Sequence, residues 1–468
     1  MNIIPLSIVI IYIIALFLVS WYSSKLSSKD GVVGYFLAGR GFPHYVVAAM
    51  VAGIAIGGAS TVGVAENAYR TGLSAGMYNA AWAAGAIIVG LVASAKFREM
   101  NISTIPEMLE KHYDLSGRVI GVFGQLVIQI VITSLQYVAG GAILAALIPD
   151  VFTFFTGTLF SALIFIAITL IGGYWGAGLT NIINVIIIYF GTIVGAIMAL
   201  NNAGGMTTLA ASLPQGDHWF DPVSGVGLAV VVAWFVVMIT QAHSTQAVVQ
   251  ISFAAKDGRN AKLGFIIGGI LILPIGFLSA IFGIVAAAQF PGIEPTMALP
   301  TVVLQLSPVI AGLILAALWA ADVSTASGLL LGSSNLVVQD IWKRFVQPEM
   351  TQKQEIVVSR VTVLVISAIT YLLAVNVLGI IRTLTIGLTL TTAYTIIILF
   401  TMFAPKLCKK GCAFWTILVG TVFLITWIFV PAIRIVPQPI YLAWPLCLAT
   451  FLLVSIIDKR PARIDLNT

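Results

Sequence analysis

The chain has 468 residues, of which 60% are hydrophobic and only 9% are charged, and its net charge is +6. A soluble domain carries about 25% charged residues, so this composition excludes an ordinary soluble protein and indicates a chain that lies in lipid. The basic residues are scattered among short loops, which excludes a nucleic-acid-binding surface. Three cysteines, Cys408, Cys412 and Cys447, are too few for a disulfide framework or a zinc site.

The hydropathy pattern predicts thirteen apolar spans. A helix needs about 20 apolar residues to cross the hydrocarbon core of a bilayer. The candidates lie near residues 3–23, 44–70, 74–95, 119–148, 155–173, 180–201, 224–251, 263–289, 308–337, 359–377, 380–404, 412–431 and 437–457. We therefore expect an all-α polytopic membrane protein in which residues 1–468 form one integrated transmembrane domain.

The first span sets the expected orientation. No positive charge precedes the apolar run 3–22, whereas Lys25 and Lys29 follow it, and this predicts a transmembrane helix with its N-terminus outside. From that start, 20 of the 23 basic residues fall in cytoplasmic loops, and the three outside are Arg70, Arg382 and Arg434. The bias predicts a multi-pass protein of the plasma membrane with a cytoplasmic C-terminus.

Two spans contain residues that interrupt a helix. The span 44–70 holds four glycines among small polar residues, and the span 224–251 holds the run from Gln241 to Gln250. A broken helix is tolerated at membrane depth only where it lines a cavity or is buried in protein. The two anomalous spans are five apart, which predicts two inverted repeats with a binding site between them. The expected division is a peripheral helix at 3–23, repeats at 44–201 and 224–404, and two C-terminal helices at 412–457.

The span 308–337 carries polar residues in the stretch WAADVSTASG at 319–328. On a helix with about 100° per residue, Ser324 lies about −60° and Thr325 about +40° from Ala321, so both hydroxyls share a face with that carbonyl region. Uncharged oxygen ligands suit sodium, a hard cation that must be released in every cycle. The alternative is that the hydroxyls bond to carbonyls of their own helix or to a neighbouring helix.

Five motifs run through the chain in order: YFLAGR (Tyr35–Arg40), TIPEMLEKHY (Thr104–Tyr113), IGGYWGAGLTN (Ile171–Asn181), FAAKDGRNAK (Phe253–Lys262) and ADVSTASGLLLGSSNLVVQDIW (Ala321–Trp342). In these motifs the chain resembles the sodium:solute symporters, the family of bacterial proline, pantothenate and sialic acid carriers and of sodium–sugar cotransporters. The resemblance implies a LeuT-type fold of five-plus-five inverted repeats. It also implies sodium-coupled uptake of a small polar organic solute by alternating access.

The resemblance further implies where sodium binds. In the family the ion lies between the first and eighth core helices. Carried over, the ligands are the backbone carbonyls of Gly53, Ile56 and Ala321 and the hydroxyls of Ser324 and Thr325. Sodium is the only ion or cofactor that this comparison implies.

Substrate contacts are carried over in the same way. The candidates are Ala55, Ser60, Asn79, Tyr137, Gln241, Thr245 and Gln246, with Thr385 and Thr389 as further positions. Ala55 stands where proline carriers have aspartate, which argues against a proline carrier. No basic residue lies at membrane depth in the pocket spans, although the amides of broken helices can hold a carboxylate. Amino acids, pantothenate-like acids, monocarboxylates and sugars all remain open as substrates.

Asp322 and His243 allow a second reading. Asp322 lies about 160° around the helix from Ser324, away from the expected sodium face. An intramembrane carboxylate marks a functional site by default, but a structural role is the alternative. His243 is either a substrate contact or an interior histidine whose ring is satisfied. The alternative function is therefore a proton-coupled symporter of the same fold that uses Asp322 or His243.

The resemblance also bears on the sodium stoichiometry. Relatives with a second sodium have an aspartate at the position of Asn181 and hydroxyls at those of Ser324, Ser327 and Gly328. Here an amide replaces the carboxylate and hydrogen replaces one hydroxyl, so we expect one sodium per substrate. The candidate coupling residues are Asp322, Asn181 and Ser327.

Other classes of protein fit less well. An enzyme is not expected, because the four histidines lie far apart without metal-ligand spacing. A channel is not expected, because no filter or charged ring is visible. The expected partners are the small polar solute and membrane lipid, without nucleic acid, and a monomer is expected to suffice for transport.

Overall fold

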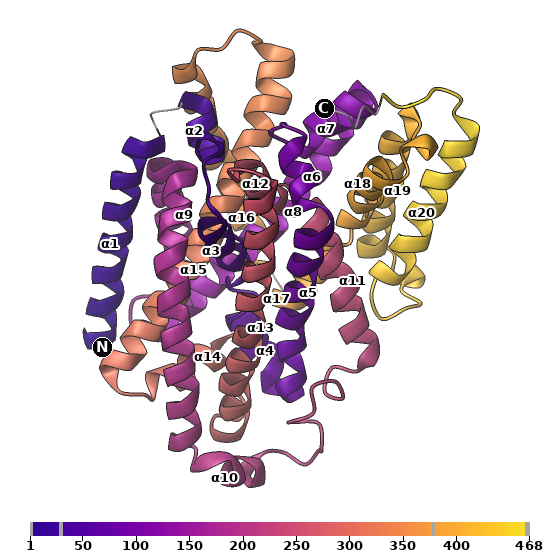
Figure 1. The fold of residues 1–468 in the computed structure, drawn as a ribbon. Coiled ribbons are helices and arrows are strands. Elements are labelled where there is room, and N and C mark those ends of the chain that lie inside the picture. Colours follow the sequence, from indigo (N-terminus) through magenta and orange to yellow (C-terminus); the bar gives the residue numbers. More distant parts are fainter. Residues whose placement is uncertain (1–2, 28–30, 377–379, 464–468) are drawn as a thin grey trace.

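The computed structural model describes residues 3–27, 31–376 and 380–463, and Figure 1 shows its fold. These residues form helices joined by loops, with two isolated β-bridges, Phe42–Ala255 and Lys409–Pro461. Lys29 and the last position of the predicted span 359–377 lie outside the described residues. The prediction of an all-α protein is confirmed for the part of the chain that the structure describes.

The helices account for every predicted span. Their order is α1 (Ile3–Ser27), α2 (Gly31–Leu37), α3 (His44–Ala55), α4 (Val62–Thr71), α5 (Met77–Val92), α6 (Ser94–Glu99), α7 (Ile105–His112), α8 (Leu115–Leu147), α9 (Phe154–Asn202), α10 (Gly205–Ser212), α11 (Leu228–Ser244), α12 (Gln246–Ala254), α13 (Gly258–Gln289), α14 (Ala298–Leu304), α15 (Pro308–Asn335), α16 (Gln352–Ala374), α17 (Ile380–Leu388), α18 (Thr391–Phe403), α19 (Lys410–Phe429) and α20 (Ile440–Ile457). A π-helical segment, Leu336–Val346, continues α15. Short 3-10 turns lie at Ala38–Arg40, Gly72–Gly76, Pro295–Met297, Pro405–Leu407 and Pro431–Ile433.

The number of membrane spans depends on how broken helices are counted. Ten of the described helical segments are long and apolar enough to cross a membrane, and there are up to twelve spans if each of two bent helix pairs is one span. The segment Val62–Val92 counts there as one span, while α3 is a shorter apolar helix. Taking α3 and α4 as one broken span, and α5 as the next, accounts for the predicted thirteen.

One helical element covers two predicted spans. The spans predicted at 155–173 and 180–201 both belong to α9, which is 49 residues long. It contains two apolar segments that can each cross a membrane, Phe154–Ile171 and Tyr174–Asn202. At about 1.5 Å per residue, α9 is much longer than one crossing requires.

The helices are arranged so that the two ends of the molecule differ. In Figure 1, α2, α6 and α7 gather at the end that holds the C-terminus, while α10 and the N-terminus lie at the opposite end. Helix α1 runs beside α9 at one edge, and α19 and α20 lie at the other edge. Helix α13 packs against α3, α4 and α5, and α15 packs against α8 and α9. The broken span formed by α3 and α4 is thus part of this packed core.

Three spans are interrupted. Helix α3 ends before the non-helical stretch 56–61, after which α4 begins. Helices α11 and α12 bend by 49° at Thr245, which has extended backbone angles. These two breaks confirm the predicted interruptions. Helices α17 and α18 bend by 44°, a third break that the sequence did not predict.

Glycines allow the first break to form because neighbouring helices approach it closely. A Cβ on Gly57 would lie 2.7 Å from the hydroxyl oxygen of Thr325 on α15, and it would also collide with Gln136 on α8. A Cβ on Gly58 would collide with Ala139 on α8. Glycine at both positions therefore lets α8 and α15 pack directly against exposed backbone, as a helix broken inside a protein requires.

A charge cluster ties three elements together at the end that holds α7. Glu110 on α7 pairs with Arg118 on α8 at 2.5 Å and with Arg344 of the π-helical segment at 2.7 Å. Arg118 also pairs with the buried Asp340 at 2.7 Å, and Asp340 accepts a hydrogen bond from Thr104. The hydrogen bonds from Arg344 and Arg118 hold the pKa of Glu110 below its usual value, although partial burial opposes them.

Candidate functional site

Two of the predicted sodium ligands, Thr325 and Gly53, meet where α15 passes the end of α3. The hydroxyl of Thr325 donates to the carbonyl of Gly53 at 2.8 Å, and the hydroxyl of Ser324 donates to the carbonyl of Ala321 at 2.9 Å. The fifth residue, Ile56, is the first after α3 and is fully buried. Four of the five residues thus form two hydrogen-bonded pairs, each of which joins a hydroxyl to a carbonyl. Both pairs offer oxygen atoms without a full charge, which suits a hard monovalent cation.

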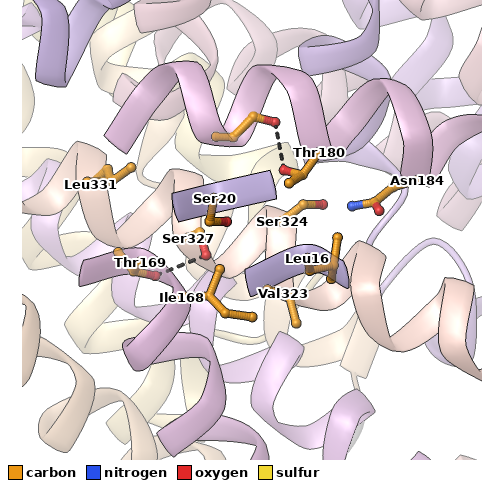
Figure 2. Close-up of a pocket in the computed structure, with 11 residues that line it drawn as sticks. Leu16, Ser20, Ile168, Thr169, Thr180, Asn184, Val323, Ser324, Ser327 and Leu331 are labelled. Carbon is orange, nitrogen blue, oxygen red and sulfur yellow. Dashed lines mark hydrogen bonds between the residues drawn. The ribbon is translucent and has the colours of Figure 1, made fainter. Parts of the chain in front are cut away.

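Ser324 also lines a cavity at the side of the core, which we call the lateral cavity. Figure 2 shows this cavity, which is lined by Leu16, Ser20, Ile168, Thr169, Ala177, Thr180, Asn184, Val323, Ser324, Ser327 and Leu331. The lining comes from α1, α9 and α15. Inside it Thr169 donates a 3.0 Å hydrogen bond to Ser327, and Thr180 donates to the carbonyl of Gly176 in its own helix. The lining is hydroxyl-rich and includes no charged side chain.

Asn181 takes a different direction from its neighbour Thr180. Its amide nitrogen lies 3.2 Å from the sulfur of Met50 on α3, and its side chain leaves no room for a Cβ on Gly53. Asn181 is therefore packed against α3, beside one predicted sodium ligand, and is not among the residues that line the lateral cavity. Ser327 lines that cavity, so the structure separates these two candidate coupling residues.

A central cavity lies at the broken spans. It is lined by Ile54, Ala55, Gly57, Ala59, Tyr78, Trp82, Ile132, Gln136, Gln241, Thr245, Val248, Leu329 and Leu384. These residues come from the α3–α4 and α11–α12 breaks and from α5, α8, α15 and α17. Among the predicted substrate contacts, Ala55, Gln241 and Thr245 belong to this lining.

The side-chain polar groups of the central cavity are two amides, the hydroxyls of Thr245 and Tyr78 and the indole N–H of Trp82. Gln241 and Gln136 carry the amides, and no charged side chain lines the cavity. The hydroxyl of Thr245 is buried without a hydrogen-bond partner among the described residues. Tyr78 and Trp82 provide aromatic surface. Apolar walls with a few polar groups are typical of a site for a small organic molecule.

The other predicted substrate contacts point elsewhere. Ser60 donates to the carbonyl of Ala55, and Asn79 is packed against Gly276 of α13. The ring of Tyr137 packs on Phe165 of α9, with ring centroids 5.8 Å apart. None of the three lines the central cavity in this conformation, so their roles stay predictions.

Gln246 is bound to backbone at the end of the molecule that holds α7. Its side-chain oxygen accepts from the backbone N–H of Ile105 at 2.8 Å, and its nitrogen donates to the carbonyl of Ser103 at 3.1 Å. It therefore joins α12 to the start of α7. The structure gives Gln246 no contact with the central cavity.

Three further candidates bond to nearby carbonyls, Thr385 and His243 within their own helices and Thr389 from the break after α17. Thr385 donates to the carbonyl of Ile381, and Thr389 donates to that of Thr385. The Nδ1 atom of His243 lies 2.7 Å from the carbonyl of Ile239, as expected for an interior histidine. None of these three residues lines the central cavity.

Asp322 places a buried carboxyl group beside the site. It is fully buried, and neither carboxyl oxygen has a hydrogen-bond partner among the described residues. A Cβ on Gly58 would lie 3.1 Å from one of these oxygens, so the carboxyl group sits beside the backbone of the α3–α4 break. Asp322 thus lies next to the site, on a different side of α15 from Ser324.

The sequence did not predict a role for two glutamines on α8, Gln125 and Gln136. The side-chain oxygen of Gln136 accepts a 2.8 Å hydrogen bond from the backbone N–H of Gly58. The side chain of Gln125 contacts both sides of the α11–α12 break. Their spacing of eleven residues places them within about 20° on one helix face. The signal in the sequence was a polar face on an otherwise apolar span, which also includes Gln129.

The sequence also matches known proteins. Residues 35–420 match the model of the sodium:solute symporter family, which is more than half of the chain. The osmoregulated proline transporter OpuE of Bacillus subtilis is 24% identical over 483 residues, which cover 97% of this chain and 94% of that protein. Sodium/glucose cotransporter 4 of Danio rerio is 26% identical, over 89% of this chain and 70% of that protein.

Solved structures share the fold. A substrate-bound, outward-open sodium-coupled sialic acid symporter superposes with a TM-score of 0.82 at 20% identity, and 98% of each chain is covered. A nucleobase-cation-symport-1 family transporter in a closed conformation gives a TM-score of 0.61 at 15% identity, over 90% of this chain and 93% of that chain. These likenesses confirm the predicted LeuT-type architecture.

Proposed function

The chain belongs to the sodium:solute symporter family and is a multi-pass, sodium-coupled symporter, and from this premise we propose that it takes up a small polar organic solute with one sodium ion per molecule. The observation that carries the proposal is the hydrogen-bonded contact between Thr325 and Gly53, which joins α15 to the broken span. The sodium ion is cargo as well as the driving ion, because its downhill entry powers uptake.

We assign the sodium ion to the predicted ligands Gly53, Ile56, Ala321, Ser324 and Thr325. The two hydroxyls now donate to two of the carbonyls. On sodium binding, each hydroxyl would turn an oxygen lone pair toward the ion, and the carbonyls would coordinate it directly. An ion bound by carbonyls of α3 and hydroxyls of α15 would hold these helices together, which would favour one conformation over the other.

The central cavity is the proposed substrate site. Gln136 and Gln241 offer both hydrogen-bond donors and acceptors, and Thr245 has an unpartnered hydroxyl. Such groups suit a solute that carries hydroxyl, amide or carboxylate groups. A carboxylate would depend on the N-terminal ends of α4 and α12, since no basic side chain lines the cavity. Relatives named for proline, glucose and sialic acid support a small polar cargo without choosing among these classes.

The proposal of one sodium rests on charge. Asn181 stands where a carboxylate would accompany a second ion, and the lateral cavity has no charged side chain. A buried cation without a counter-charge pays a desolvation penalty of several kcal/mol. One ion entering down a membrane potential of about 100 mV supplies about 2.3 kcal/mol, in addition to its concentration gradient.

The proposed arrangement in the membrane follows from the loop charges. We place the N-terminus outside and the C-terminus in the cytoplasm, so the end that holds α2 and α7 is cytoplasmic. Residues 44–201 and 224–404 form the two inverted repeats, 3–23 is peripheral and 412–457 adds two helices. All proposed ligands come from one chain, which supports transport by a monomer in the plasma membrane, with lipid as its surroundings.

Uptake into proteoliposomes tests the function directly. Candidate solutes are first screened by their sodium-dependent effect on the melting temperature of the purified protein. Uptake of a stabilising solute is then measured under an imposed sodium gradient or an imposed proton gradient. We expect accumulation with the sodium gradient alone. Accumulation with the proton gradient alone would instead support proton coupling through Asp322 or His243.

A further inference from the structure

The break between α11 and α12 leaves several backbone groups without helical partners, among them the Ser244 carbonyl and the Gln246 N–H. In a continuous helix, the Ser244 carbonyl would accept from Val248 and the Gln246 N–H would donate to Ala242. Because Thr245 is extended, Val248 donates to the carbonyl of Thr245 instead. A buried backbone group that lacks a partner is costly at membrane depth. Something else must therefore satisfy Ser244 and Gln246.

One side chain satisfies both groups. The Gln125 amide nitrogen donates to the Ser244 carbonyl at 2.6 Å, and its oxygen accepts from the Gln246 N–H at 2.9 Å. Gln125, Ser244 and Gln246 are all fully buried. A neutral carboxamide matches this pair, because it carries a donor nitrogen and an acceptor oxygen on one rigid group.

The geometry makes these two bonds sensitive to bending. Helix α12 turns by 49° relative to α11 at Thr245. A change in this angle moves the Ser244 carbonyl and the Gln246 N–H relative to each other. One rigid amide can then no longer reach both groups, so bending of the hinge and loss of the bridge occur together.

Helix α12 lies between the central cavity and the end of the molecule that holds α2 and α7. Val248 lines the cavity, whereas Gln246 binds the backbone of Ser103 and Ile105. Gln250 donates to the carbonyl of Phe36 on α2 at 2.7 Å. In this conformation α12 is thus held at its middle by Gln250 and at the hinge end by Gln246 and Gln125.

We propose that Gln125 is the latch of the α11–α12 hinge, a positioning residue that holds α12 over the cytoplasmic side of the central cavity until the hinge bends for release. The proposal rests on the proposed function, since it presumes alternating access. Gln125 does not touch the solute or the ion. It acts by stabilising one of the two conformations between which the transporter exchanges.

The test measures access to the cavity from the cytoplasm. A reporter cysteine replaces Val248 in a chain whose buried Cys408, Cys412 and Cys447 are changed to alanine. Inside-out membrane vesicles are treated with a membrane-impermeant thiol reagent, with and without sodium, and the labelling rate is measured. Two variants are compared, Gln125→Met and Gln125→Leu, and each loses both hydrogen bonds. Thr133→Val is the matched control, because its buried hydroxyl donates only to Gln129 in its own helix.

We expect labelling in Gln125→Met and in Gln125→Leu to rise about tenfold without sodium, because hydrogen bonds that stabilise the closed state are lost. Thr133→Val should label at the rate of the unmodified reporter chain. Unchanged labelling in both Gln125 variants, with a normal sodium response, would overturn the latch and leave the proposed function standing. No sodium response in the reporter chain itself would count against the proposed function. Loss of both Gln125 variants from the membrane, while Thr133→Val inserts, would show a role in folding and not in switching, which also overturns the proposal.

Discussion

Thr325 on α15 and Gly53 on α3 are joined by a 2.8 Å hydrogen bond from the threonine hydroxyl to the glycine carbonyl, although 272 positions separate them in sequence. The bond connects a continuous helix to the last turn of a broken one. It holds in contact two groups that the family resemblance assigns to one sodium ion.

Removing either hydroxyl should weaken sodium activation. We expect Ser324→Ala and Thr325→Ala each to raise the sodium concentration for half-maximal uptake by at least about fivefold, because each loses an oxygen ligand. Ser333→Ala is the control, since that hydroxyl donates only to Leu329 in its own helix. The measurement is uptake at fixed solute over a range of sodium concentrations. Unchanged sodium dependence in the Ser324/Thr325 double variant would refute the site.

The stoichiometry should be one sodium per solute. We expect the reversal potential in proteoliposomes to balance a solute gradient against an equal sodium gradient together with the membrane potential, as one ion requires. Asn181→Asp should leave this balance unchanged, because residue 181 is packed against Met50 and Gly53 and does not line the lateral cavity. A two-to-one balance in the unmodified protein would mean that the lateral cavity binds sodium without a carboxylate.

Gln241 should matter more for solute binding than Tyr137. Gln241 lines the central cavity, whereas the Tyr137 ring packs on Phe165. We expect Gln241→Leu to raise KM by about fivefold or more through loss of a hydrogen bond, and Tyr137→Phe to change KM little. Both are measured by initial uptake rates at saturating sodium. An equal effect of the two variants would show that Tyr137 reaches the solute in another conformation.

Asp322→Asn should keep sodium-driven uptake. The carboxyl group has no partner among the described residues, and a buried charge without a partner destabilises a protein. We therefore expect a higher melting temperature in detergent and a nearly unchanged half-maximal sodium concentration. If the variant still exchanges solute but no longer accumulates it against a gradient, then Asp322 takes part in coupling.

Glu110 should make stability depend on acid pH. Its pairing with Arg344 and Arg118 lowers its pKa in the folded state, so its contribution is fully present above its unfolded pKa of about 4.3. That contribution is lost as the pH falls through the lower pKa of the folded state. We expect the melting-temperature difference between the unmodified protein and Glu110→Gln to be largest near neutral pH and to close in acid. The exposed Glu349, changed to Gln, should show no such difference at any pH.

The sequence predicted the elements whose signals are local. Hydropathy located each span, and clustered glycines or polar residues located the breaks near Gly57 and Thr245. The break between α17 and α18 lies in the threonine-rich stretch RTLTIGLTLTT at 382–392, but threonine is common in packed transmembrane helices, so this stretch did not identify a break. The sequence also could not predict the orientations of Asn79 and Tyr137, because a position on a helix does not determine which neighbouring helix the side chain contacts.

Helix α8 carries Gln125 to one break and Gln136 to the other, eleven residues apart on the same face. Inserting or deleting one residue between them would rotate one glutamine away from the other by about 100° and shift it by about 1.5 Å along the axis. Only one of the two glutamines could then still form its hydrogen bonds at its break. These hydrogen bonds therefore fix the number of residues between Gln125 and Gln136. We expect insertions and deletions among related transporters to occur outside this part of α8.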